Sequence, residues 1–144
     1  MHHKYSETDA DPHNAKRGFF FSHVGWLLVK KHHDVKELGK NIDMSDLKLD
    51  PVVMFQRKYY IPLVLLIWGA MPTFIPCILW GEHKVNSFFI CVTLRYCLTL
   101  NLTWFVNSAA HMWGTRPYDG RIEPRECSIR HLLLGEGFHN FHHT

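Results

Sequence analysis

The longest uninterrupted hydrophobic stretch of the chain runs from Tyr60 to Trp80 and contains no charged side chain. As a helix rising about 1.5 Å per residue, this stretch matches the hydrocarbon core of a bilayer, which is about 30 Å thick. A second apolar stretch, from Phe88 to Ala110, is also long enough to span and is interrupted mainly by Arg95. Residues 81–87 leave room for a turn. The pattern predicts a transmembrane helical hairpin with both ends of the chain on one side.

Polar residues dominate on both sides of this hairpin. The apolar run from Gly18 to Val29 is the exception, and it is too short to cross a membrane. We therefore expect an all-α integral membrane protein in three parts. These are a cytosolic cap segment at 1–58, the hairpin at 59–110 and a second cytosolic segment at 111–144.

The distribution of basic residues indicates the orientation of the hairpin. Residues 1–58 carry ten Lys and Arg side chains and the tail after His111 carries four, whereas the loop between the spans has Lys84 alone. Because basic residues accumulate on cytoplasmic flanks, both flanks are predicted to be cytosolic. The net charge of +3 is small and the acidic residues are interleaved with the basic ones, so nucleic acid is not an expected partner. The four cysteines form no C-x-x-C pair, and no disulfide or thiolate site is implied.

Histidines gather at both ends of the chain, outside the two predicted spans. His139, His142 and His143 have the i, i+3, i+4 spacing that places side chains on one face of a helix. His2 and His3 look like the end of the same H-x-x-H-H pattern. Two membrane crossings put both groups on the same side, where they can meet. Single histidines at membrane ends are often interfacial or pH-sensitive residues, but the joint pattern predicts a metal site.

A stripe of polar residues on the second span leads toward the same side. Thr99, Thr103, Asn107 and His111 recur at every fourth position and therefore share one helix face. We expect this stripe to face protein rather than lipid and to deliver His111 to the other histidines.

The identity of the metal is less constrained by the spacing. Imidazole suits zinc, copper, iron and nickel alike. A structural zinc is satisfied by four ligands, so six converging histidines indicate two metals. A redox-active pair with nitrogen ligands suits oxygen activation, for which iron is the usual metal, and the spacing alone moderately favours iron.

The chain resembles the membrane fatty acyl-CoA desaturases, of the stearoyl-CoA desaturase type, and most closely the insect members. The resemblance covers nearly the whole chain. The matching segments are His2 to Asn14 (H-H-K-Y-S-E-T-D-A-D-P-H-N), Phe19 to Trp26, Asn107 to His111 (N-S-A-A-H), Arg116 to Asp119 and Gly135 to Thr144. The stretch from Cys127 to Leu134 departs most from the family.

The resemblance implies a four-span protein whose cytosolic cap holds two iron ions through nine histidines and one water-bridged asparagine. The first histidine box, the first two spans and the leading histidine of the second box are expected before Met1, so the chain would be an inactive fragment by itself. The implied metal ligands in this chain are His2, His3, His111, His139, His142, His143 and, through water, Asn107.

The implied reaction introduces a double bond into a fatty acyl-CoA at the endoplasmic reticulum membrane. It uses molecular oxygen and electrons from a b-type haem cytochrome with its NADH-dependent reductase. By resemblance, Lys30 and Lys31 lie near the coenzyme A phosphates, Trp26 near the acyl tunnel, and Thr103 and Trp104 at the kink of that tunnel. A basic pair can also simply mark a membrane interface, and Trp104 can be ordinary packing.

Two other functions share parts of this pattern. A membrane diiron fatty acid hydroxylase has nearly the same histidine spacing, although the full strings around His2 and Asn107 favour a desaturase. A histidine-rich metal transporter or sensor would need ligands along the spans, and the stretch from Tyr60 to Trp80 has no histidine.

Overall fold

The computed structural model describes residues 1–128, 131, 133 and 135–144. The divergent stretch noted above therefore lies partly outside the described residues. The described residues form helices and isolated β-bridges but no β-strand. They divide into two compact units, one made of Met1–Ile42 with Leu100–Thr144 and the other of Asp43–Thr99. The membrane boundaries at 58 and 110 stay predictions, because packing rather than a bilayer defines these units.

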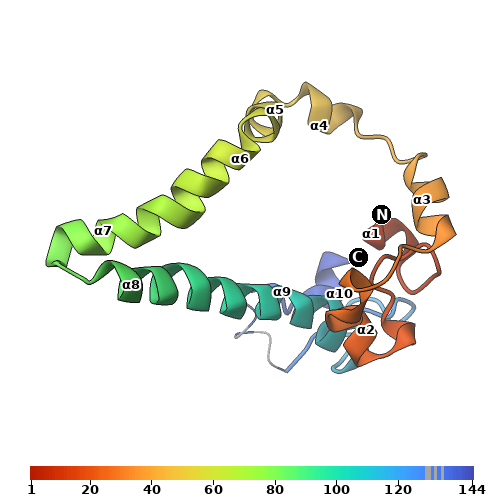
Figure 1. Cartoon of the computed structure of the whole chain (residues 1–144). Coiled ribbons are helices and arrows are strands. Elements are labelled where there is room, and N and C mark those ends of the chain that lie inside the picture. Colours follow the sequence, from red (N-terminus) through yellow and green to blue (C-terminus); the bar gives the residue numbers. More distant parts are fainter. Residues whose placement is uncertain (129–130, 132, 134) are drawn as a thin grey trace. The chain divides into compact units, whose positions relative to one another are not determined.

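The unit from Asp43 to Thr99 contains the first predicted span and the first part of the second (Figure 1). Its helices are α4 (Ser45–Leu49), α5 (Pro51–Lys58), α6 (Tyr60–Leu63), the π-helical η3 (Val64–Ala70), α7 (Met71–Trp80), α8 (Lys84–Ser87), the π-helical η4 (Phe88–Leu94) and the start of α9 (Arg95–Met112).

Two continuous helical runs in the described part of the chain are long and apolar enough to cross a membrane. They cover Tyr60–Trp80 and Lys84–Met112, which confirms the predicted pair of membrane-length helices. The expected seven-residue connection is wrong, because the second run begins at Lys84. Gly81 makes the shorter turn possible, since it ends α7 in the left-handed conformation, with φ of 72°.

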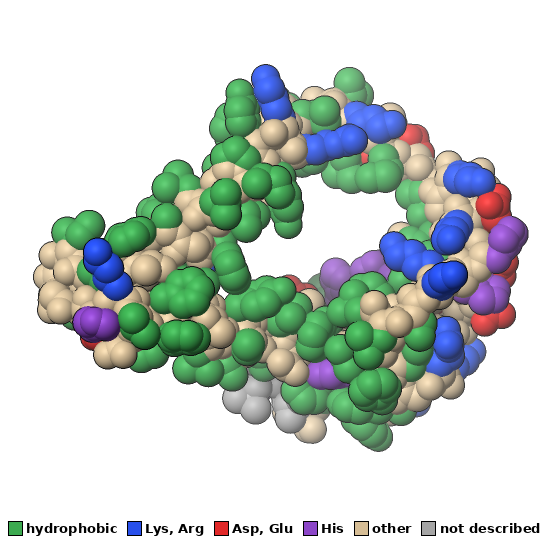
Figure 2. Space-filling view, in the orientation of Figure 1, with side chains coloured by type: hydrophobic (Ala, Val, Ile, Leu, Met, Phe, Trp, Pro, Cys, Tyr) green, Lys and Arg blue, Asp and Glu red, His purple; other side chains and the backbone are tan. Residues whose placement is uncertain are grey.

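The hairpin helices expose large apolar side chains rather than polar ones. Leu65, Ile78 and Leu79 are each about two-thirds or more exposed. Figure 2 shows hydrophobic side chains spread over these helices on the visible face. A surface of this kind is stable in contact with lipid and costly in water.

Pro72 interrupts the hydrogen bonding of the first long helix, and the second helix compensates. Proline has no N–H to donate to the carbonyl four residues earlier, which here belongs to Trp68. The guanidinium of Arg95 donates to this carbonyl oxygen at 3.1 Å. The rings of Trp68 and Tyr96 also pack edge to face, 5.2 Å apart. Arg95 therefore bonds within the hairpin.

Pro76 likewise has no N–H to donate to the carbonyl of Pro72, four residues earlier. The buried hydroxyl of Ser87 lies 3.1 Å from this carbonyl oxygen and 2.7 Å from that of Thr73, and it can donate to either. Polar side chains of the second helix thus satisfy the carbonyls exposed by both prolines.

The other unit carries the six histidines predicted as metal ligands and α9 from Leu100 onward. Its remaining helices are α1 (His2–Tyr5), η1 (Ala15–Arg17), α2 (Phe19–His23), η2 (Gly25–Leu27), α3 (His33–Gly39) and α10 (His139–His142). Among the described residues of this unit, Ala109, Ala110 and Cys127 form a buried apolar cluster, against which Phe19 and Phe105 pack.

The tail after α9 folds back so that the closing histidines lie beside the helix end. Bridges join Thr115 to Glu126 and Glu126 to Phe138. Gly114 allows the first of these contacts, because its φ is 132° and a Cβ there would lie 2.2 Å from the carbonyl oxygen of Glu126. This return of the chain positions residues 139–144.

Candidate metal centre

Four of the predicted ligands converge from three helices onto one point. The ligand nitrogens of His2, His111, His139 and His143 all lie within 4.8 Å of one another. The Nε2 atom of His111 is 2.7 Å from that of His139 and 3.2 Å from that of His2. The Nε2 atoms of His143 and His139 are 3.2 Å apart. His111 and His139 are buried. We call this set the four-histidine group.

The other two predicted histidine ligands form a pair beside this group. The Nε2 atoms of His3 and His142 are 3.2 Å apart, and both side chains are more exposed than the four-histidine group. The ring of His3 stacks on that of His143 with 4.2 Å between centroids. All six predicted histidine ligands are therefore contiguous.

Asn107 lies one turn before His111 on α9 and is half-buried. Among the described residues, no hydrogen bond joins its side chain to a histidine. The polar stripe that contains Asn107 is covered unevenly, since Thr99 and Thr103 are exposed whereas His111 is buried. The expectation that the whole stripe faces protein therefore stays a prediction for Thr99 and Thr103.

Two carboxylates hold the far sides of two of these imidazoles. Oε1 of Glu7 lies 2.7 Å from Nδ1 of His111, and Oδ1 of Asp11 lies 2.9 Å from Nδ1 of His2. Both carboxylates are buried. Burial by itself raises the pKa of Asp11, but hydrogen bonds led by that from His2 outweigh it and hold the pKa below its ordinary value. Asp11 is thus an ionised acceptor.

The donor set fits a metal cation. In a neutral imidazole whose Nδ1 donates to a carboxylate, as the geometry of His2 and His111 allows, Nε2 keeps its lone pair. Two bare lone pairs 3.2 Å apart repel each other unless a cation lies between or beside them. Carboxylate–histidine pairs of this kind orient metal ligands and raise their basicity.

The electrostatics favour the neutral form of His139 and His143, which is the form that binds a metal. Burial, followed by the neighbouring His111, lowers the pKa of His139 to about 2. Burial, followed by the neighbouring His3, lowers the pKa of His143 to about 3. Nδ1 of His139 is also buried and has no partner among the described residues.

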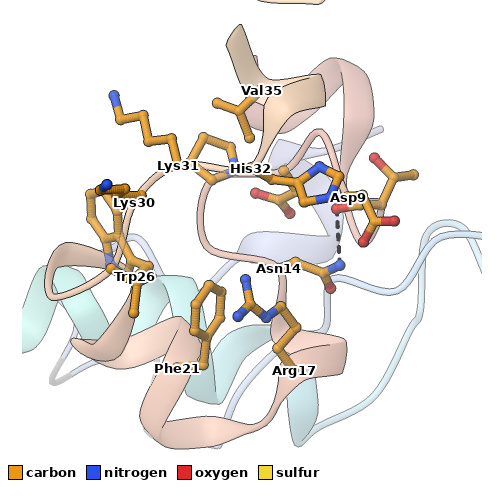
Figure 3. Close-up of a pocket in the computed structure, with 13 residues that line it drawn as sticks. Asp9, Asn14, Arg17, Phe21, Trp26, Lys30, Lys31, His32 and Val35 are labelled. Atoms are coloured by element: carbon orange, nitrogen blue, oxygen red, sulfur yellow. Dashed lines mark hydrogen bonds between the residues drawn. The ribbon is translucent and has the colours of Figure 1, made fainter.

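A polar cavity of about 170 Å³ (Figure 3) is lined in part by Asp11, the carboxylate that contacts Nδ1 of His2. Trp26, Lys30 and Lys31 line it, and Lys31 extends outward. The indole Nε1 of Trp26 is buried without a partner in the described part of the chain, so it is available to donate. Thr103 and Trp104 are not in this lining, and they lie along α9 instead.

The carboxylates of Glu7 and Asp11 are site residues to which the sequence analysis gave no role. The sequence feature that could have indicated them is the presence of acidic residues just after a histidine pair and before Pro12.

Two further histidines lie close to the metal-site histidines. The ring of His13 is 4.2 Å from that of His2, and Nδ1 of His23 lies 3.0 Å from the hydroxyl of Ser108. His13 thus adjoins the site, whereas His23 joins α2 to α9.

No profile of a known protein family matches the chain. Individual proteins do match along its whole length. The acyl-CoA desaturase of Cyprinus carpio is 63% identical over 145 residues, covering 100% of this chain and 44% of the relative. Human stearoyl-CoA desaturase 5 is 59% identical over 99% of this chain and 44% of its own length. The acyl-CoA Delta-9 desaturase of the cricket Acheta domesticus is 59% identical over 100% of this chain and 40% of the relative.

The cricket protein is no more similar to this chain than these vertebrate proteins are. These identities therefore do not confirm the prediction that the chain is most similar to insect members. The chain spans 40–44% of the length of these relatives. Identity near 60% over the full chain establishes common descent, and the chain belongs to the acyl-CoA desaturase family.

Proposed function

We propose that the polypeptide containing this chain introduces a double bond into a fatty acyl-CoA. The observation that carries the proposal is the four-histidine group, whose Nε2 atoms converge while carboxylates hold His2 and His111 from behind. The names of the relatives supply the reaction class.

In this proposal the chain supplies ligands to two iron ions. The four-histidine group holds one position, and the more exposed pair of His3 and His142 contributes to the other. Asn107 acts through a water molecule from its place one turn before His111. The iron ions, when bound, supply the redox chemistry with molecular oxygen, and a b-type haem cytochrome with its NADH-dependent reductase supplies electrons.

The cavity beside the histidines is the proposed place for the coenzyme A head group. Its phosphates are anionic, and Arg17, Lys30 and Lys31 line the cavity. The free indole N–H of Trp26 can donate to a bound acceptor. The acyl chain would then extend along α9 past Thr103 and Trp104, and positioning of one carbon–carbon bond near the metals is the task of the protein.

The proposed location is the membrane of the endoplasmic reticulum, with the histidines on the cytosolic side. The two membrane-length helices and the excess of basic residues on both flanks support this orientation.

Expression of the complete open reading frame in desaturase-deficient yeast tests the function. Mass spectrometry of the acyl chains should find new monounsaturated products. Hydroxylated acyl products would identify a diiron hydroxylase instead. Tight zinc binding without oxygen-dependent turnover would identify a metal transporter or sensor.

A further inference from the structure

Helix α10, which carries the closing histidines, is too short to be stable by itself. It comprises His139–His142, a single turn, with His143 at its C-terminal cap. Isolated helices shorter than about 12 residues are marginal in water. The directions of these three imidazoles must therefore be set by contacts outside the helix.

Asn140 makes most of those contacts, although it occupies a variable position of the H-x-x-H-H pattern. Its side chain is completely buried. Oδ1 accepts hydrogen bonds from the backbone N–H groups of Tyr118 at 2.9 Å and Asp119 at 3.1 Å. Nδ2 donates to the backbone carbonyls of Asp119 at 3.0 Å and Pro124 at 2.9 Å.

This arrangement uses the amide of Asn140 fully, with two bonds accepted and two donated. Aspartate has nearly the same shape, but its ionised carboxylate has no hydrogen to donate. It would turn a charged oxygen toward two carbonyl oxygens in a buried site, which is strongly unfavourable. The contacts therefore require an amide and not merely a side chain of this size.

Glu126, in the same loop, also binds helix α10. Oε1 of Glu126 accepts the backbone N–H of Phe141 at 3.1 Å, and the backbone of Glu126 bridges to Phe138. The loop from Tyr118 to Glu126 thus fixes both the side chain and the backbone of the turn.

We propose that Asn140 is the positioning residue of the closing histidine turn. His139 and His143 belong to the four-histidine group, whereas His142 belongs to the pair with His3. A displaced turn therefore disturbs both metal positions together. The inference rests on the proposed function only in taking these histidines as metal ligands.

The test compares Asn140→Asp with the wild type in metal-free protein purified from the complete open reading frame. Each is titrated with Co²⁺ while the visible absorption of the bound ion and the far-ultraviolet circular dichroism are recorded. Asn140→Asp should bind Co²⁺ at least 10-fold more weakly and give a changed visible spectrum, with the helical signal retained. Asn86→Asp makes the same chemical change at an exposed position of the hairpin and should match the wild type.

Two results would overturn the inference. One is an Asn140→Asp protein with wild-type Co²⁺ affinity and spectrum. The other is loss of helical signal throughout the protein, since the proposed role is confined to the closing turn. Failure of the proposed function is distinguishable, because then the wild type itself binds no metal at the histidines or forms no double bond.

Discussion

Nδ1 of His111 and Oε1 of Glu7 lie 2.7 Å apart, although 104 positions separate them in the chain. Glu7 has a positive φ of 61°, which is unfavourable for a residue with a side chain. Its second carboxylate oxygen accepts the backbone N–H of Lys16 at 3.2 Å. The loop after α1 therefore holds a strained backbone conformation that directs a buried carboxylate at the imidazole on α9.

Glu7→Gln should weaken metal binding while leaving the fold intact. The amide keeps the shape of the side chain but replaces the carboxylate that contacts Nδ1 of His111. Loss of such a partner typically weakens metal binding about 10- to 100-fold. Co²⁺ titration of the metal-free protein measures this change. Asp9→Asn alters an exposed carboxylate on the same loop and serves as the control, and equal affinities in the two variants would contradict the assigned role.

His142→Ala should abolish oxygen-dependent desaturation without reducing membrane insertion. His142 is exposed and pairs with His3, so its loss removes a ligand and leaves no buried cavity. Activity in membranes and protease protection of the spans are the two measurements. His83→Ala, in the exposed turn of the hairpin, should retain full activity. Turnover by the His142 variant would exclude it as a required ligand.

Lys30→Met should raise the KM for acyl-CoA and leave kcat nearly unchanged. Lys30 lines the cavity that we assign to the coenzyme A phosphates, and exposed ion pairs of this type contribute up to about 1 kcal/mol. A rise in KM of roughly 2- to 5-fold follows, and it should shrink at high salt. Lys36→Met changes an exposed lysine of α3 outside the cavity lining and should have no effect.

Acidification should destabilise the metal-free protein. Burial is the largest cause that lowers the pKa of His13 to about 4, of His143 to about 3 and of His139 to about 2. An unfolded histidine binds its proton below about pH 6.5, so below that pH the unfolded state binds more protons than the folded state. The free energy of unfolding therefore falls as pH drops below 6.5, by about 1.4 kcal/mol per pH unit for His139 alone.

Thermal unfolding of metal-free protein at pH 7.5 and pH 5 measures this effect. The midpoint should be lower at pH 5, and His139→Gln should reduce the difference between the two pH values. A midpoint at pH 5 equal to or above that at pH 7.5 would show that these histidines titrate normally in the folded state.

Ser87→Ala should destabilise the hairpin, because the Pro72 carbonyl then loses the side-chain donor that reaches it. One such hydrogen bond contributes roughly 0.5–1.5 kcal/mol. Thermal unfolding in detergent should show a lower midpoint than for Ser45→Ala, in which an exposed serine is changed. Equal midpoints would mean that the Ser87 hydroxyl is dispensable.

The hydrophobic pattern correctly predicted both end residues of the first long helix. A membrane span must match the thickness of the bilayer, so its length can be read from an uninterrupted apolar run. The helical spacing of His139, His142 and His143, together with an even number of crossings, also anticipated that the histidines meet. The second helix begins earlier than predicted, since the turn needs only Gly81 and two more residues.

The residues that support the histidines could not be identified in this way. Glu7 contacts His111 from a loop in which its own φ is positive, and no local sequence pattern marks that conformation. In the sequence, Asn140 occupies a variable position of the histidine motif. Its contacts with the loop at 118–124 appear only in the folded chain. Roles that depend on long-range packing become visible only in the structure.

The iron content of active protein purified from the complete open reading frame tests the central claim most directly. We expect two iron ions per polypeptide, held in part by His2, His3, His111, His139, His142 and His143, and their loss on substitution of these residues. Tightly bound zinc without iron, in protein that shows no oxygen-dependent turnover, would contradict it.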